Sequence, residues 1–284
     1  MQIDGRTRLF GILGSAVAHS LSPALHNRIF EHHHINAAYV PLPVADLKRN
    51  RLDHLFSSNF HGFSVTIPFK NQAARIADKC DLLTQHSGAA NTLIPHPGGI
   101  EAINTDGPGA IRALRETVKN LEGLTYLILG YGGSAAGLSH ALLLEGLPGR
   151  LLLSGRNINR ARRLAENLKK LHRPDRTLIL ALPEPKIQPG EVDVIINTTP
   201  LGMEGMPQTL PVAGDFIQRK HTVFDIVYKP LRTPLLALAS RVGARSIPGY
   251  TMLLYQAALQ SELFTGKKAP IPLMEKILLK SLKS

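Results

Sequence analysis

The stretch LTYLILGYGGSAAG, residues 124–137, decides the fold of this chain of 284 residues. It opens with an apolar run of strand length, Leu124 to Leu129, and a helical pattern follows from Ser134 to Glu145. Glycines between a strand and a helix allow the tight turn and the close backbone approach that a pyrophosphate group needs. The helix N-terminus adds partial positive charge for phosphates. The stretch therefore predicts a dinucleotide-binding unit.

Each small residue of this loop has an expected task. Gly130 is expected to make the tight turn, Gly132 to admit the pyrophosphate, and Ala135 to let the helix pack on the strand. The candidate cofactor-binding residues of the loop are Gly130, Gly132, Gly133, Ser134 and Ala135. The alternative is a glycine-rich turn without a ligand, which the flanking strand and helix disfavour.

Four further apolar runs of strand length follow, at Arg150–Leu153, Thr177–Leu182, Val192–Asn197 and Thr222–Val227. Apolar strands that alternate with helical patterns are typical of a parallel sheet covered on both faces. The first hundred residues alternate short strands and helices, and the pattern after Gly249 is helical. We expect an α/β fold with two domains, an N-terminal α/β substrate domain and a Rossmann-like, doubly wound parallel-sheet domain. The C-terminal helices are expected to return to the first domain, so that residues 1–107 and 249–284 form one domain and 108–248 the other.

The end of the second strand indicates which dinucleotide binds. It reads Ser154-Gly155-Arg156, followed by Asn157, with Arg160 one helical turn further on. NAD-binding proteins usually carry Asp or Glu here to hold the ribose 2′-hydroxyl. Two guanidinium groups suit a 2′-phosphate instead. NADP is therefore predicted over NAD; the alternative is that both arginines are surface charges.

A possible acid–base pair precedes the glycine loop. Lys70 ends the run SVTIPFK, whose first four residues are the end of a strand expected over Phe60–Ile67. Asp106 lies at an expected turn in INTDG. A lysine held near an aspartate in a cleft can exchange a proton with a substrate oxygen. A proton donor followed by a hydride carrier indicates a reductase that acts on a carbonyl or an alcohol. The alternative for Lys70 is a surface lysine paired with a nearby acid.

Two hydroxyl groups, those of Ser20 and Ser22, stand at the start of an expected helix in HSLSP, residues 19–23. Ser22 is predicted as the N-cap and Pro23 as the first helical residue. Hydroxyls beside a helix N-terminus bind a carboxylate well. On these residues alone, the plainer interpretation is that Ser22 only caps the helix and Ser20 is incidental.

Composition limits the partners. The net charge is +12, from 33 basic and 21 acidic residues, which favours anionic partners. The charge is spread along the chain and aromatic residues make up only 5%, so nucleic-acid binding is not expected. Cys80 is the only cysteine, which rules out an internal disulfide. Adjacent histidines, His32 to His34, point in different directions on a helix, and no metal site is expected.

Targeting signals are not expected either. Residues 1–9 are polar and charged, unlike a secretory signal, and no apolar stretch approaches the roughly 20 residues that span a bilayer. We therefore expect a cytoplasmic protein without a membrane partner. It is expected to act on a small molecule as a monomer or a homodimer.

Taken together, these segments resemble the shikimate dehydrogenase family. The resemblance runs through nearly the whole chain, in order and spacing. It is carried by GSAVAHSLSPALHN (14–27), SVTIPFK (64–70), GAANTL (88–93), NTDG (104–107), GYGGSAAG (130–137), NTTPLGM (197–203), FDIVYKPLRTPLL (224–236) and GYTMLLYQAALQSELFTG (249–266). It implies reversible, NADP-dependent reduction of 3-dehydroshikimate to shikimate in the biosynthesis of aromatic amino acids.

The resemblance also implies roles for single residues. Lys70 and Asp106 match the catalytic pair of the family, and Ser20 and Ser22 match the residues that hold the substrate carboxylate. Contacts with the ring hydroxyls or the carboxylate are implied for Thr66, Asn91, Tyr228 and Gln256. Segments that line the nicotinamide side of the cleft contain Thr198, Thr199, Gly249 and Met252. The clamp for the 2′-phosphate matches Arg156 and Arg160.

The chain departs from the family pattern at three points. Ser64 stands where the family often has Asn, which alters a substrate contact. Gly155-Arg156-Asn157 stands where Asn-Arg-Thr is common, so that a hydroxyl for the 2′-phosphate is lost, and Tyr131 replaces a small residue of the glycine loop. Two alternatives stay open: a quinate/shikimate dehydrogenase that uses NAD, and a non-catalytic NADP-binding regulatory homologue on the same fold.

Overall fold

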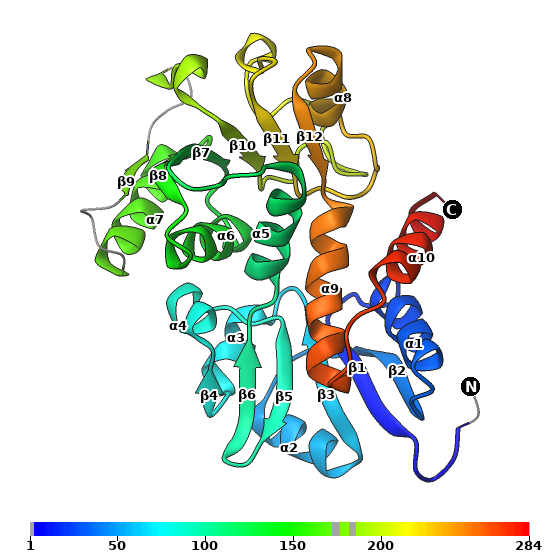
Figure 1. Ribbon diagram of the computed structural model, residues 1–284. Coiled ribbons are helices and arrows are strands. Elements are labelled where there is room, and N and C mark those ends of the chain that lie inside the picture. The colour runs from blue at the N-terminus through cyan, green and yellow to red at the C-terminus, as the bar shows by residue number, and fades with distance from the viewer. Residues whose placement is uncertain (1–2, 172–176, 182–185, 284) are drawn as a thin grey trace. The chain divides into compact units, whose positions relative to one another are not determined.

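The computed structural model describes residues 3–171, 177–181 and 186–283. The chain divides into two compact units, which are described separately below (Figure 1). Unit 1 comprises residues 1–109 and 254–284, and unit 2 comprises residues 110–253. The divisions fall inside two helices, α5 (Asp106–Thr117) and α9 (Tyr250–Thr265).

Unit 1 contains a mixed sheet with the strand order β2-β1-β3-β5-β6-β4. Its described strands are β1 (Arg8–Gly14), β2 (Ala37–Pro43), β3 (Phe60–Val65), β4 (Lys79–Cys80), β5 (Thr92–His96) and β6 (Gly99–Ile103). β1 lies parallel to both β2 and β3, whereas β5 is antiparallel to β3 and β6. The mixed pairing follows from the connections, because β5 and β6 form a hairpin while helices connect the parallel strands.

Helices cover this sheet on both faces. In unit 1 they are α1 (Ser22–His32), α2 (Arg49–Ser57), α3 (Lys70–Ile76), α4 (Leu82–Ser87), the C-terminal part of α9, and α10 (Ile271–Lys283). Because side chains alternate along a strand, β3 sends Phe63 and Val65 into the apolar cluster that α2 and α3 complete. Gly62 and Ser64 face the other side, where a side chain at Gly62 would collide with Phe264 of α9. Ser64 is thus a polar residue on a buried face.

Unit 2 is built on a sheet whose described strand pairs are all parallel, in the order β12-β11-β10-β7-β8-β9. The strands are β7 (Leu124–Leu129), β8 (Pro148–Ser154), β9 (Leu178–Ala181), β10 (Val194–Asn197), β11 (Thr222–Asp225) and β12 (Arg245–Pro248). The strand order reverses between β7 and β10, and ligands of doubly wound sheets bind at such a switch point. The predicted α/β fold with a doubly wound parallel sheet is confirmed.

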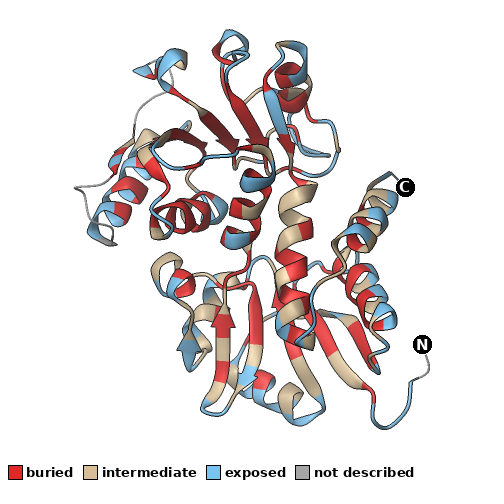
Figure 2. Cartoon of the chain, viewed as in Figure 1, coloured by how far each residue is buried: buried red, intermediate tan, exposed pale blue. Residues whose placement is uncertain are grey.

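The helices of unit 2 differ in burial, as Figure 2 shows by colour. Those that lie entirely in unit 2 are α6 (Gly133–Leu144), α7 (Ile158–Leu171) and α8 (Pro234–Arg241). α6 is buried along most of its length, from Ala135 to Leu143, which agrees with its apolar sequence. α7 buries one stripe, including Ala161 and Leu168, and exposes its basic residues to solvent.

Several elements differ from the prediction. β9 is shorter than the run Thr177–Leu182, of which Leu182 lies outside the described residues. β12 was not predicted, because its sequence RSIP is short and its first two residues are exposed. Helices α2, α4, α5 and α8 were also missed. α2 has a largely polar sequence, α4 is only six residues long, α5 begins with Asp-Gly-Pro-Gly, and α8 is a short helix that begins with a proline. In the described part of the chain, no helix combines the length and apolar character that crossing a bilayer requires.

Candidate active site

Lys70 is the first residue of α3 and does not extend from a strand. β3 ends at Val65, two residues before the predicted end at Ile67. The reason lies in the pairing: the register between β1 and β3 stops at Val65, and the Phe69 N–H bonds back to the Thr66 carbonyl at 2.9 Å, which closes a turn. This turn carries the chain from the sheet into α3.

The backbone around Lys70 is bound to the segment that leads into Asn91. The Lys70 carbonyl accepts a hydrogen bond from the Ala90 N–H at 2.9 Å, and the Asn71 side chain donates to the Gly88 carbonyl at 2.8 Å. These bonds fix the start of α3 against that segment. The Lys70 side chain stays 34% exposed, so its ammonium group can reach a small molecule.

Asp106 is the first residue of α5 and not part of a turn, which corrects the expectation from sequence. The Asn104 side chain accepts hydrogen bonds from the backbone N–H groups of Asp106 at 3.0 Å and Gly107 at 3.3 Å. Asparagine commonly caps a helix in this way. The Asp106 carboxylate therefore lies at a helix N-terminus, where partial positive charge stabilises its negative charge.

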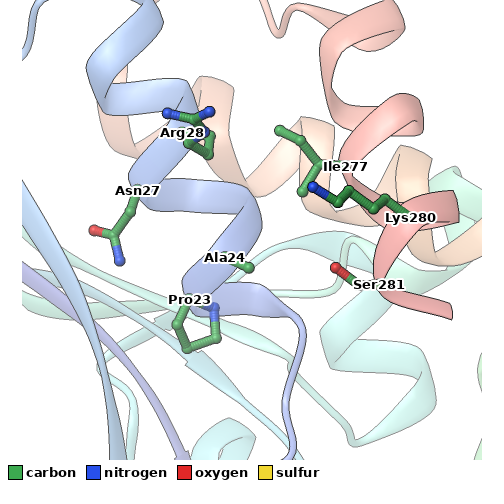
Figure 3. Close-up of a pocket in the computed structure, with 7 residues that line it drawn as sticks. All are labelled: Pro23, Ala24, Asn27, Arg28, Ile277, Lys280 and Ser281. Atoms are coloured by element: carbon green, nitrogen blue, oxygen red, sulfur yellow. The ribbon is translucent and has the colours of Figure 1, made fainter. Parts of the chain in front are cut away.

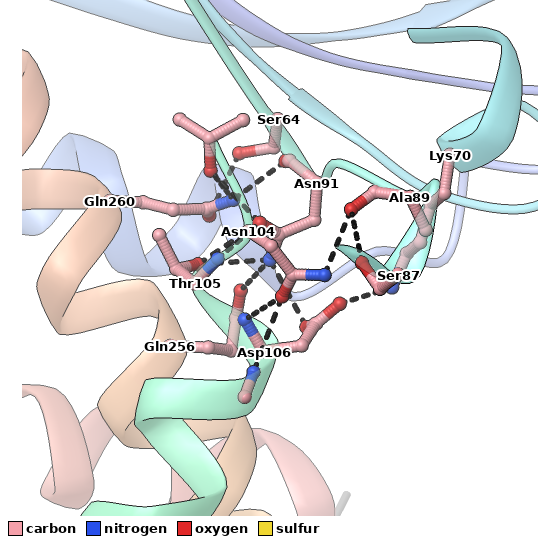
Figure 4. Close-up of polar contacts among 12 residues, drawn as sticks. Ser64, Lys70, Ser87, Ala89, Asn91, Asn104, Thr105, Asp106, Gln256 and Gln260 are labelled. Atoms are coloured by element: carbon pink, nitrogen blue, oxygen red, sulfur yellow. Dashed lines mark hydrogen bonds and ion pairs between the residues drawn. The ribbon is translucent and has the colours of Figure 1, made fainter. Parts of the chain in front are cut away.

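The structure brings Lys70 and Asp106 together within unit 1 (Figure 4). Lys70 Nζ lies 2.7 Å from Asp106 Oδ2, and the two side chains are 34% and 24% exposed. Asn91 Nδ2 donates to the other carboxylate oxygen at 3.0 Å. The carboxylate is thus held from both sides. A partly exposed ammonium–carboxylate pair of this kind can exchange a proton with a bound oxygen.

Asn91, which is buried, links this pair to α9. Its Nδ2 lies 2.9 Å from Thr105 Oγ1 and 3.2 Å from Gln256 Oε1, and its Oδ1 accepts from the Thr105 N–H at 2.8 Å. α5 and α9 approach closely here, because a side chain at Gly109 would collide with the Gln256 backbone. The side chains of Asn91, Asp106 and Gln256 therefore form one hydrogen-bonded group.

Ser22 is the first residue of α1, so its prediction as the N-cap is wrong by one position. The helix begins earlier because the Leu25 N–H donates to the Leu21 carbonyl at 3.1 Å. Ser20 takes over part of the capping task, since its Oγ accepts from the Ser22 N–H at 3.2 Å. Both hydroxyl groups nevertheless lie at the start of α1, as the sequence indicates.

The two remaining predicted substrate residues belong to different units. Thr66 is partly exposed in unit 1, where its N–H donates to the Leu13 carbonyl at 2.9 Å. Tyr228 lies in unit 2 and is 42% exposed. It follows β11 in a segment that the buried Asp225 carboxylate holds, through a hydrogen bond from the Val227 N–H at 3.2 Å.

The glycine loop lies at the switch point of the unit 2 sheet. Gly130 has a φ of +120°, and a side chain there would collide with Thr198, which follows β10. At Gly132 and Gly133 a side chain would meet nothing within 4 Å, so the space before α6 is open. No side chain caps α6, which leaves its first N–H groups for a phosphate.

The predicted cofactor residues Ser134 and Ala135 lie in the first turn of α6. Ser134 is exposed in the first turn, beside the open space before the helix. Ala135 is fully buried at the start of α6. A small residue at this place lets the helix start close to β7.

Arg156, Asn157 and Arg160 are exposed at the end of β8 and the start of α7. Asn157 Oδ1 accepts from the Arg160 N–H at 3.1 Å. The Arg160 guanidinium carbon lies 5.9 Å from the centre of the Tyr131 ring, beside the glycine loop. Two guanidinium groups and an uncapped helix N-terminus at one edge of a parallel sheet fit a dinucleotide that carries several phosphates.

The other candidate cofactor residues also lie in unit 2. The hydroxyls of Thr198 and Thr199 both donate to protein oxygens at 2.7 Å. Gly249 is packed so tightly against the backbone of Ile226 that no side chain would fit there. Met252 is partly exposed in the first turn of α9.

Unit 1 also contains a groove of about 570 Å³ between α1 and α10 (Figure 3). It is lined by Pro23, Ala24, Asn27, Arg28, Ile277, Lys280 and Ser281, none of which is a predicted site residue. The Arg28 guanidinium pairs with Glu31 at 2.6 Å. Among the described residues, no group of three or more His, Cys, Asp or Glu side chains is placed to hold a metal ion.

Sequence reasoning missed four residues in and beside this site. Asn104 caps α5 and Thr105 binds Asn91, although both belong to the NTDG segment that was singled out for Asp106. Gln260 lies one helical turn after Gln256, and this spacing could have identified it, because such residues share a helix face. Tyr39 of β2, whose hydroxyl donates to Ser64 at 2.6 Å, gave no comparable signal, since a tyrosine in a buried strand is ordinary core.

The fold and the site define a class: an α/β oxidoreductase with a dinucleotide-binding parallel sheet and a lysine–aspartate pair in a second unit. A family model described as the shikimate dehydrogenase substrate binding domain matches residues 12–93, and one described as the shikimate 5′-dehydrogenase C-terminal domain matches residues 249–279. The shikimate dehydrogenase (NADP(+)) of Leptospira interrogans is 39% identical over 91% of this chain and 89% of its own length. The chain belongs to the shikimate dehydrogenase family.

Further relatives agree with this assignment. The shikimate dehydrogenase (NADP(+)) of Methanopyrus kandleri is 36% identical and covers 100% of this chain and 99% of its own. The structure of shikimate 5-dehydrogenase from Thermus thermophilus, in complex with NADP(H) and shikimate, superposes with a TM-score of 0.85 at 30% identity. That superposition covers 97% of this chain and 100% of the other.

Proposed function

We propose that the protein catalyses the reversible, NADP-dependent reduction of 3-dehydroshikimate to shikimate in the biosynthesis of aromatic amino acids. The observation that carries this proposal is the 2.7 Å contact between Lys70 Nζ and Asp106 Oδ2, partly exposed in a chain of this family. In this proposal, residues 1–107 and 249–284 form the substrate domain. Residues 108–248 form the domain that binds NADP.

Lys70 and Asp106 are the catalytic pair in this proposal. An ammonium group next to the substrate carbonyl stabilises the negative charge that develops on its oxygen and then supplies the proton. Asp106 keeps the amine in place, and Asn91 keeps Asp106 in place through its 3.0 Å hydrogen bond. In the oxidative direction the same pair takes the proton from the hydroxyl group. Positioned acid–base groups of this kind typically contribute about 10²- to 10⁴-fold to the rate.

The substrate is a carboxylate that carries hydroxyl groups, and unit 1 offers partners for both. Ser20 and Ser22 stand at the N-terminus of α1, where hydroxyls and partial positive charge favour a carboxylate. Thr66, Asn91 and Gln256 are the proposed partners of the ring hydroxyls. Tyr228 of unit 2 is proposed to contact the same substrate.

NADPH, when bound, supplies the hydride. The chain holds its phosphates through the first N–H groups of α6 and through the loop of Gly130, Gly132, Gly133, Ser134 and Ala135. Arg156, Asn157 and Arg160 hold the 2′-phosphate, because guanidinium groups bind phosphate oxygens in a bidentate manner. The nicotinamide side of the site is lined by Thr198, Thr199, Gly249 and Met252.

The setting of this activity is part of the same proposal. The protein acts in the cytoplasm on a small molecule, as a monomer or a homodimer, without a nucleic-acid or membrane partner. Its positive net charge of +12 accords with two anionic ligands, because a basic surface raises the local concentration of anions.

A matrix of oxidation rates tests the proposal: shikimate and quinate, each with NADP and with NAD, on the purified protein. We expect the highest kcat/KM for shikimate with NADP. A preference for NAD together with turnover of quinate would instead identify a quinate/shikimate dehydrogenase. Tight binding of NADP without turnover of either substrate would identify a non-catalytic homologue.

A further inference from the structure

Tyr131 is the only large residue of the glycine loop, whose other members from Gly130 to Ala135 are glycine, serine or alanine. It lies between the end of β7 and the start of α6 and is partly buried. The N–H of its neighbour Gly130 donates to the Ser154 carbonyl at 2.8 Å, which binds the loop to the last residue of β8. Tyr131 therefore lies close to the segment that leads from β8 into α7.

The Tyr131 ring packs directly on Gly155, the first residue after β8. A Cβ atom at Gly155 would lie 2.9 Å from Tyr131 Cδ1 and 3.0 Å from Cε1, closer than carbon atoms normally approach. The backbone of Gly155 is not in the left-handed region that favours glycine, so the ring and not the backbone accounts for glycine here. Tyr131 and Gly155 are thus a complementary pair, in which the ring occupies the space of a side chain at position 155.

Arg160 lies beside the same ring. Its guanidinium carbon is 5.9 Å from the centre of the Tyr131 ring, a range at which a guanidinium group is attracted to an aromatic face. The Arg160 backbone is fixed in the first turn of α7, because its N–H donates to Asn157 Oδ1 at 3.1 Å. The Arg160 side chain is exposed and long, and such side chains have many rotamers. The ring restricts this freedom before any ligand binds.

We propose that Tyr131 is a positioning residue for the 2′-phosphate of NADP, because its ring holds the Arg160 guanidinium at the end of β8. This inference rests on the proposed function, which assigns Arg160 to that phosphate, and deepens it. A guanidinium group over an aromatic face keeps its N–H donors for phosphate oxygens, and ordering it in advance lowers the entropic cost of binding. NAD lacks the 2′-phosphate. Tyr131 therefore increases the preference for NADP over NAD.

The test measures the dissociation constants of NADP and NAD by calorimetry for the wild type, Tyr131→Phe and Tyr131→Leu. Phenylalanine keeps the aromatic face, whereas leucine keeps apolar bulk without it. We expect Tyr131→Leu to weaken NADP about 2- to 5-fold, which corresponds to about 0.5–1 kcal/mol for an exposed cation–π contact. NAD should bind as tightly as to the wild type, and Tyr131→Phe should bind both cofactors like the wild type. Unchanged NADP affinity in Tyr131→Leu, or equal changes for the two cofactors, would overturn the inference.

A double-mutant cycle shows whether Tyr131 acts through Arg160. In the Arg160→Ala background, Tyr131→Leu should weaken NADP no further, because the guanidinium that the ring positions is already absent. Arg163→Ala is the matched control, an exposed arginine one helical turn further along α7. In that background Tyr131→Leu should show its full effect. Multiplicative losses of NADP affinity in the Tyr131/Arg160 pair would mean that the ring acts independently of Arg160, against the inference.

Gly155→Ala changes the same contact without altering Tyr131 or Arg160. The added methyl group must displace the Tyr131 ring, so we expect the ratio of the NAD to the NADP dissociation constant to fall about as far as in Tyr131→Leu. In the Tyr131→Ala background the methyl group has room, and Gly155→Ala should not change that ratio. A wild-type ratio in Gly155→Ala alone, or a further fall in the Tyr131→Ala background, would contradict the inference.

The wild type in the same calorimetric series separates this inference from the proposed function. A wild type that binds NADP more tightly than NAD but does not oxidise shikimate would overturn the proposed reaction, and the role of Tyr131 would still be decided by its variants. A wild type that binds the two cofactors equally well would overturn the proposed 2′-phosphate clamp, and the inference with it.

Discussion

At the scale of single residues, Asp106 is the best-supported group of the site. One carboxylate oxygen accepts from Lys70 and the other from Asn91, while the Asn104 side chain caps its backbone N–H. Both carboxylate oxygens and the backbone N–H of Asp106 therefore have hydrogen-bond partners, which fix the orientation of the carboxylate. The acid–base pair is therefore preorganised, which is how a fixed site contributes to rate without reorganisation during the reaction.

The arginines at the end of β8 are predicted to select the cofactor. We expect Arg156→Ala combined with Arg160→Ala to raise the KM of NADP at least about 10-fold, because charge-assisted hydrogen bonds contribute about 1.5–3 kcal/mol each. The KM of NAD should change little. The ratio of kcat/KM for NADP to that for NAD, measured with shikimate, checks this.

Arg163→Ala is the control, an exposed arginine on the same helix α7. It should leave that ratio unchanged. An unchanged ratio in the Arg156/Arg160 variant would mean that these two arginines are ordinary surface charges.

His26 predicts a pH dependence of stability. Burial lowers its pKa to about 3, with a weaker opposing effect of Gln260, whereas an unfolded histidine titrates near 6.5. Below about pH 6.5 the unfolded chain binds a proton at His26, whereas the folded chain does not. The contribution of neutral His26 to the unfolding free energy is therefore fully present above that pH and decreases as pH falls. The expected loss is about 1.4 kcal/mol per pH unit between about pH 6.5 and 3.

Denaturant unfolding of the wild type and His26→Phe at several pH values measures this effect. The difference in unfolding free energy between the two proteins should shift in favour of the variant as pH falls. Parallel curves for the two proteins would show that His26 is not kept neutral by the fold.

Only some of the site residues could be predicted from the sequence. Lys70 and Asp106 could be paired because each lies in a short motif of recognisable type, and the structure joins them at 2.7 Å. Ser22 was misplaced by one residue because a Ser-Pro pair at a helix start does not fix which residue is the cap. The hydrogen bond from the Tyr39 hydroxyl to Ser64 could not be predicted, since its partner lies 25 residues away on another strand.

At the scale of elements, the buried carboxylate of Asp225 joins three segments of unit 2. It accepts from the Asn197 side chain at the end of β10 at 2.9 Å, and from the Thr233 hydroxyl at the start of α8 at 2.6 Å. The Val227 N–H binds it as well. Burial raises the pKa of Asp225, while these hydrogen bonds lower it. The segment that carries Tyr228 is thereby attached to the sheet at both ends.

Thr233→Val tests this attachment. Thr233 donates to the Asp225 carboxylate and also caps α8 by accepting from the Leu236 N–H at 3.3 Å. We expect the variant to lose about 2–4 kcal/mol of unfolding free energy, since a hydrogen bond to a buried charge and a helix cap are both removed. Urea denaturation measures the loss.

The matched control is Thr251→Val, which removes a neutral hydrogen bond from Thr251 to the Pro248 carbonyl. About 1 kcal/mol is expected there. Equal losses of unfolding free energy in the two variants would mean that the hydrogen bond from Thr233 to the Asp225 carboxylate is no stronger than a neutral hydrogen bond.

Elements were predictable where the apolar pattern was strong. β7, β8, β10 and β11 are buried strands of a parallel sheet, and continuous apolar runs announce such strands. α5 was missed because it begins with Asp-Gly-Pro-Gly, which is typical of a turn, and only tertiary contacts and the Asn104 cap make it helical. β12 was missed as a short edge strand.

At the scale of the whole molecule, the chain combines two units with complementary chemistry. Unit 2 has the doubly wound sheet and the open glycine loop of a dinucleotide site, and unit 1 has the acid–base pair with its supporting amides. The order of motifs along the chain predicted that the lysine–aspartate pair and the glycine loop belong to different units, because each motif depends on local sequence. The boundaries between the two units could not be predicted to the residue. They fall inside α5 and α9, where the helical sequence pattern continues across the boundary.

The most direct test of the account is the turnover number of Lys70→Ala with shikimate and NADP, beside the wild type. We predict a loss of at least about 100-fold in kcat, the lower range for a positioned acid–base group. Calorimetry should show that NADP and shikimate still bind with nearly wild-type affinity. A variant that turns over at close to the wild-type rate would contradict the central claim, because the proton would then not pass through Lys70.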